Sequence, residues 1–98
     1  MKKEEDFSEI LKVAKRELLS KETKSIILKY KKYAGKFQEA YHAEWLSTYY
    51  SPILAALRKY LSQDLTDKNI LEVGYGLPLF IFYLKSIGSN AFGMDIGP

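Results

Sequence analysis

The residues whose types and spacing favour chemistry lie near the end of the chain, around a pair of glycines. Glu72 lies at the end of a short apolar run, and Gly74 and Gly76 follow it. Asp95 comes 21 residues after Gly74, close to the separation of about 20 at which an acidic side chain accepts hydrogen bonds from ribose hydroxyls. Glycine suits such a turn because the backbone bends sharply and a β-carbon would hold a ligand away. The pattern predicts a nucleoside pocket.

The elements that must position these residues are predicted from a change in the spacing of apolar residues near residue 68. Residues 70–73 form a short apolar run that ends at glycine, which is typical of a strand buried on both faces in a parallel sheet. Residues 78–87 are predicted to form a helix that ends at Gly88, and residues 91–95 a second strand. A ligand would bind at the carboxyl end of the first strand, facing the amides of the helix N-terminus.

Four helical segments are predicted before residue 64. Asp6 has the spacing of a capping box that starts the first helix near Phe7, and a weak break at residues 20–23 separates it from the second. Gly35 is predicted to cap the second helix. A further helical pattern begins at Phe37 and is interrupted at Ser51 and Pro52, where Ser51 is expected to cap a fourth helix and Pro52 to start it.

A change of composition marks the predicted internal boundary. Residues 1–68 carry 14 lysines and arginines and 10 acidic residues, whereas residues 69–98 carry one basic and two acidic residues. Five of the six glycines also fall in the second part. We therefore predict a helical N-terminal extension over residues 1–66 and a partial nucleoside-binding segment over residues 67–98.

Residues 69–76, Asn-Ile-Leu-Glu-Val-Gly-Tyr-Gly, resemble the first motif of class I S-adenosylmethionine (SAM) dependent methyltransferases. The resemblance implies an α/β fold in which N-terminal helices precede the first βαβ unit of a Rossmann-like sheet, here incomplete. It also implies that Glu72 positions the amino end of the methionine part of SAM, that the two glycines approach the cofactor, and that Asp95 holds the ribose. The implied activity is that of a methyltransferase, a class of transferase.

Two positions in the turn bear on this resemblance. Tyr75, between the glycines, is a candidate to stack on the cofactor, or else an exposed loop aromatic. Pro78 stands where the family motif usually has a third glycine, so one amide donor is missing there. The resemblance covers residues 69–96. The strands that supply the adenine pocket and the catalytic and acceptor-binding loops of the family have no counterpart, so we expect a truncated cofactor-binding portion that is not catalytically competent alone.

Two alternatives remain open. A dinucleotide (NAD) fragment would use the same geometry. However, the dinucleotide-binding motif requires a third glycine at the position of Leu79, and it assigns no role to an acidic residue at Glu72. A non-enzymatic helical interaction protein would retain a degenerate half-site and cover its strands by forming a homo-oligomer, because a two-stranded parallel pair is not stable alone.

Several partner classes are not expected. The chain has no cysteine and a single histidine, His42, so we predict neither a disulfide framework nor a metal site. The lack of cysteine also fits a protein of the reducing cytoplasm, which is where we expect it. No signal peptide or membrane-spanning run is recognised.

One stretch of the chain combines lysines with aromatic residues. We interpret its aromatic residues as a buried stripe flanked by solvated lysines, in preference to a nucleic-acid surface. The stretch consists of Lys29, Tyr30, Lys31, Lys32, Tyr33, Lys36 and Phe37.

Overall fold

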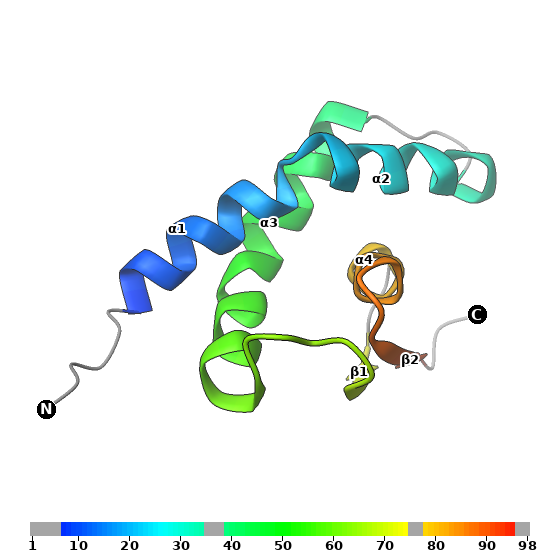
Figure 1. The fold of residues 1–98 in the computed structure, drawn as a ribbon. Coiled ribbons are helices and arrows are strands. Elements are labelled where there is room, and N and C mark those ends of the chain that lie inside the picture. Colours follow the sequence, from blue (N-terminus) through cyan, green and yellow to red (C-terminus); the bar gives the residue numbers. More distant parts are fainter. Residues whose placement is uncertain (1–6, 35–38, 75–77, 96–98) are drawn as a thin grey trace, which may run out of the picture.

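The computed structural model describes residues 7–34, 39–74 and 78–95. Over these residues the chain is mixed α/β, with helices preceding a two-stranded parallel sheet (Figure 1). The elements are α1 (Phe7–Leu18), α2 (Lys21–Ala34), α3 (Glu39–Ala56), the π-helical turn η1 (Leu57–Leu61), β1 (Asn69–Val73), α4 (Leu79–Ser86) and β2 (Asn90–Met94).

The first two helices follow the predicted pattern. α1 begins at Phe7 and buries Ile10, Ala14 and Leu18, which lie on one face at three- and four-residue spacing. Ser20 caps the start of α2, because its Oγ accepts a hydrogen bond from the backbone N–H of Thr23 at 3.2 Å. The predicted break between the two helices is therefore confirmed.

Some predictions for this half of the chain concern residues outside the described ranges. The capping box at Asp6 and the helix-ending role of Gly35 fall there. The side chains of residues 30–41 are also not described, so the buried aromatic stripe expected at Tyr30, Tyr33 and Phe37 stays a prediction.

The predicted interruption at Ser51 and Pro52 is wrong, because α3 runs through both residues. Ser51 is fully buried and its hydroxyl has no hydrogen-bond partner among the described residues, so it does not act as a cap. Pro52 is exposed, and a proline inside a helix costs about 3 kcal/mol or more. Burial of Leu46 and Leu54, one on each side of the proline along the helix, offsets this cost and keeps the helix continuous.

The second half of the described structure is a βαβ unit. β1 and β2 pair in parallel, with Ile70 opposite Ala91 and Glu72 opposite Gly93. α4 connects the strands and packs on the sheet on one side and against α2 on the other (Figure 1). This arrangement places α4 between the N-terminal helices and the sheet.

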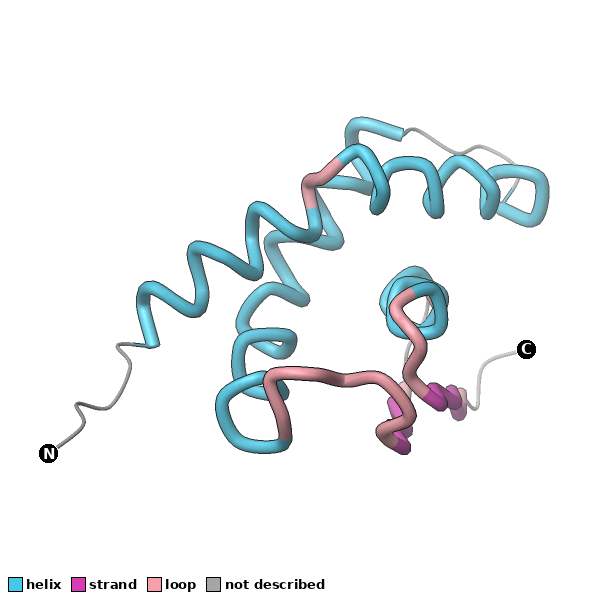
Figure 2. The backbone as a smooth tube through the Cα atoms, in the orientation of Figure 1, coloured by secondary structure: helices cyan, strands magenta, loops and turns pink. Residues whose placement is uncertain are grey.

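The segment between η1 and β1 reaches from the helices to the sheet, as the backbone trace shows (Figure 2). It is tied to the turn that precedes β2. Ser89 Oγ donates to the Leu65 carbonyl at 2.7 Å, and the Asp67 N–H donates to the Gly88 carbonyl at 2.8 Å. Gly88 itself has a φ of +95°, a conformation that favours glycine, and it ends α4 as predicted.

The two faces of the sheet differ. On the face toward α4, Ala91 is only 3% exposed and Ile70 is half-buried. The opposite face consists of large apolar side chains that remain 54–71% exposed: Leu71, Val73, Phe92 and Met94. The prediction that residues 70–73 are buried on both faces is therefore wrong for this structure, because among the described residues helices cover one face only.

Among the described residues, no helix combines the length and the apolar character needed to cross a membrane.

Candidate functional site

The predicted site residues that the structure describes meet at one edge of the sheet, the carboxyl ends of the two parallel strands. Glu72 is the fourth residue of β1, Gly74 follows β1 directly, and Asp95 follows β2 directly. The Gly74 N–H donates to the Met94 carbonyl at 2.6 Å, so the ends of the two strands are joined. The structure therefore gathers these three residues as the sequence predicts.

The remaining two predicted residues, Tyr75 and Gly76, lie outside the described residues. Pro78 is described and precedes α4 directly, where its carbonyl accepts the N–H of Phe82 at 3.1 Å. Among the described residues, no side chain caps the start of α4.

Glu72 has two oxygens in different situations. Oε2 accepts a hydrogen bond from the hydroxyl of Tyr50 on α3. Oε1 is buried and has no hydrogen-bond partner among the described residues. Across the strands from Glu72 stands Gly93, so no cross-strand side chain occupies the place beside the carboxylate. A buried acceptor without a donor costs about 1–3 kcal/mol, and more if it is charged, which makes this oxygen a candidate to receive a ligand donor.

Gly74 has the conformation and the free space of a ligand-facing turn. Its φ is +72°, in the left-handed region that non-glycine residues rarely adopt. A β-carbon built on Gly74 would meet no heavy atom within 4 Å. The strand therefore ends in a turn that leaves open space beside its backbone.

Tyr50 is the fixed partner in the contact with Glu72. It is 7% exposed, and its ring stacks on Phe80 at 4.6 Å between centroids and meets Trp45 edge-on at 5.5 Å. Burial raises the pKa of the Tyr50 hydroxyl above its ordinary value, and the hydrogen bond to Glu72 and the charge of that carboxylate raise it further. The hydroxyl therefore stays protonated and donates at neutral pH.

Sequence reasoning missed Tyr50 as a site residue. The spacing of His42, Trp45, Tyr49 and Tyr50 is typical of residues that share part of a helix surface, and it favours packing over a ligand or partner role. Tyr50 lies 22 residues before Glu72 and on a different kind of element, so no spacing rule relates the two. Their contact exists only because α3 passes the end of β1.

No family model matches the chain, and the comparisons with curated proteins and solved structures find nothing similar to it. Within residues 7–34, 39–74 and 78–95, acidic and histidine side chains form no group of three that could hold a metal ion.

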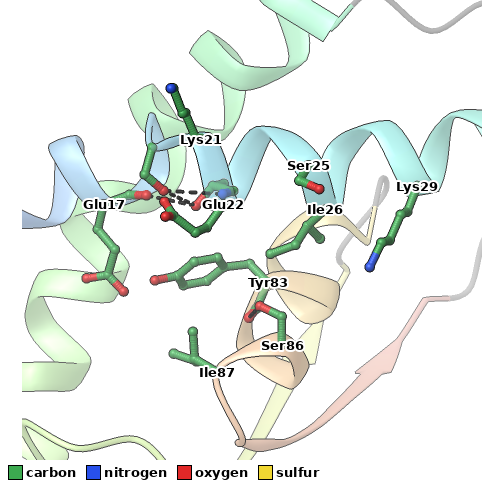
Figure 3. A pocket seen from close by; sticks show the side chains of 11 residues that line it. Glu17, Lys21, Glu22, Ser25, Ile26, Lys29, Tyr83, Ser86 and Ile87 are labelled. Atoms are coloured by element: carbon green, nitrogen blue, oxygen red, sulfur yellow. Dashed lines mark hydrogen bonds between the residues drawn. The ribbon is translucent and has the colours of Figure 1, made fainter.

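The structure also holds a pocket of about 740 Å³ away from the predicted site, between the start of α2 and the end of α4 (Figure 3). The ring of Tyr83 extends from α4 across this pocket toward Glu17. The Tyr83 hydroxyl is buried without a partner among the described residues. Lys21 and Glu22 also line the pocket, so its charges are of both signs and define no ligand class. Glu72, Gly74 and Asp95 do not line it.

Proposed function

We propose that the chain carries the cofactor-binding βαβ segment of a Rossmann-like, SAM-dependent methyltransferase. The observation that supports this best is the half-satisfied carboxylate of Glu72 at the carboxyl end of β1. One of its oxygens is held by Tyr50, and the other is buried with no partner among the described residues. The ammonium group of a methionine moiety is a donor that would satisfy such an oxygen.

Two further features fit SAM as the ligand. Gly74 leaves open space at the end of the strand, where the cofactor would approach the backbone. Asp95 is exposed at the end of the neighbouring strand, where a carboxylate accepts the hydroxyls of a ribose. Glu72 would thus hold the methionine end of one elongated ligand and Asp95 its central ribose, with Gly74 between them.

SAM, when bound, supplies an electrophilic methyl group on its sulfonium for transfer to a nucleophilic acceptor. The contribution of the described residues is to bind and orient the cofactor. Glu72 would hold the ammonium end, and Asp95 the ribose.

The test is a calorimetric titration of the purified chain with SAM, S-adenosylhomocysteine and NADH. We expect saturable binding of the first two, weakened at least tenfold by Gly74→Ala because a β-carbon would stand in the open space. Gly88→Ala is the matched control, because it strains a left-handed glycine at the other end of α4 and should leave SAM affinity unchanged. Absence of binding by the folded chain, or preference for NADH, would contradict the proposal.

A second candidate function is self-association without catalysis, which the exposed sheet face favours. Leu71 lies beside Phe92 and Val73 beside Met94, so four large apolar side chains form one continuous surface. Surfaces of this kind mark interaction sites when they are large. Sedimentation equilibrium would show a dimer that Phe92→Lys dissociates; a monomer at all concentrations would exclude this candidate.

A further inference from the structure

We infer that Tyr50 of α3 is a positioning residue of the cofactor site, which holds Glu72 so that its second oxygen is left for an ammonium group of the ligand. The inference rests on the proposed function, because it adds a residue to the same site. It goes beyond the motif resemblance, since Tyr50 lies on the N-terminal helices and outside residues 69–96.

The contact itself defines the orientation of the carboxylate. A carboxylate accepts through both oxygens and turns freely about its last bond unless a partner fixes it. Here the Tyr50 hydroxyl donates to Oε2, while Oε1 is buried and has no partner among the described residues. One oxygen is thus used for positioning, and the other is left for recognition.

Tyr50 can position Glu72 because its own ring is held. The ring stacks on Phe80 with an interplanar angle of 25° and meets Trp45 at 60°. Phe80 belongs to α4, the helix that follows the glycine pair in sequence. Tyr50 is therefore packed against the same helix that begins after this pair. A side chain packed on two elements keeps its hydroxyl in one place, as a supporting residue of a binding site must.

The expected consequence is selective. Without the hydroxyl, Glu72 loses its fixed orientation, and ligands that present an ammonium group lose affinity. A ligand that lacks this group has no contact to lose. 5′-Methylthioadenosine has the nucleoside and the sulfur atom of the cofactor, here as a neutral thioether, but no amino-acid part, so it reports on the rest of the site alone.

The experiment compares calorimetric affinities of the 98-residue chain for SAM and for 5′-methylthioadenosine. Tyr50→Phe keeps the ring and removes the hydroxyl. We expect roughly tenfold weaker SAM binding, the scale of one hydrogen bond to a charged group, and less than about twofold change for 5′-methylthioadenosine. The matched control is Tyr49→Phe, because Tyr49 is the adjacent residue and is 63% exposed, and it should change neither affinity.

A double variant separates positioning from a general effect on the fold. If Tyr50 acts through Glu72, Tyr50→Phe should weaken SAM binding no further when Glu72→Gln is already present. Additive losses, equal losses for both ligands, or no loss in Tyr50→Phe would each overturn the inference while the wild-type chain still binds SAM. Failure of the wild-type chain to bind SAM would overturn the proposed function and the inference with it.

Discussion

The N-terminal helices and the two-stranded sheet contain similar apolar residues but bury them to different degrees. Leu18, Leu46 and Leu54 of the helices are fully buried, because α1 and α3 pack their apolar stripes against each other. In the sheet, Leu71 is 57% and Val73 71% exposed. The helices bury one shared apolar stripe and leave other large apolar side chains exposed, such as Val13, Leu28 and Ile53, whereas the sheet buries only one of its two faces.

This difference indicates which part of the molecule contributes most to its stability. Apolar burial contributes about 25 cal/mol for each Å² removed from water, so the helices supply stabilisation that the outer sheet face does not. Two buried polar atoms without a partner among the described residues also differ in position. Ser51 Oγ belongs to a residue inside α3, while Glu72 Oε1 belongs to the fourth residue of β1, near the carboxyl end of that strand. Under the proposed function, the second of these atoms would meet the ligand.

The largest expected effect compares one leucine from each half. Leu46→Ala should lower the free energy of unfolding by about 2–5 kcal/mol, because it leaves a cavity among fully buried neighbours. Leu71→Ala should lower it by less than about 1 kcal/mol, because that side chain is already largely in water. Urea denaturation of both variants measures the difference. Equal losses would mean that the outer face is covered in solution, and the comparison would fail.

Local periodicity was sufficient to predict much of this architecture. The stripe of α1, the break at Ser20 and the order of strand, helix and strand follow from apolar spacing and turn residues. The continuity of α3 through Pro52 did not, because packing on both sides of the proline overrides its local preference. The exposure of Leu71 could not be predicted either, since an apolar strand gives no sign of how many of its faces are covered.

A smaller effect is expected at the two glycines that flank α4. Gly88→Ala should destabilise the fold by about 1–3 kcal/mol, because φ is +95° and the new β-carbon would lie 3.1 Å from Thr66 Cγ2 on the segment from the helices. Gly74→Ala should cost only about 1–2 kcal/mol of backbone strain, since it meets no atom within 4 Å. Thermal unfolding ranks the two variants. A greater loss for Gly74→Ala would show that its open space is filled by the protein itself.

The sequence predicts the part of the candidate site that lies at the ends of the two strands. It does not predict the part that comes from another element of the fold. Glu72, Gly74 and Asp95 come together because parallel strands end at one edge, which is a rule of topology. Tyr50 contacts Glu72 from α3, and this contact depends on how the helices pack against the βαβ unit. That docking is set by burial of many side chains, such as Phe80, and no short motif records it.

The smallest expected effect concerns this link between the two halves. An unfolded tyrosine ionises near pH 10, whereas burial and Glu72 hold the pKa of Tyr50 in the folded chain above that value. Tyr50 therefore contributes its full stabilisation below about pH 10 and loses it as the pH rises further, because the unfolded state then releases a proton that the folded state keeps. The stability advantage of the wild-type chain over Tyr50→Phe should shrink in alkaline solution. Urea denaturation of both proteins from pH 8 to 11 measures this, and titration of the other tyrosines cancels in the difference. An advantage that stays constant would mean that the hydroxyl does not link α3 to β1.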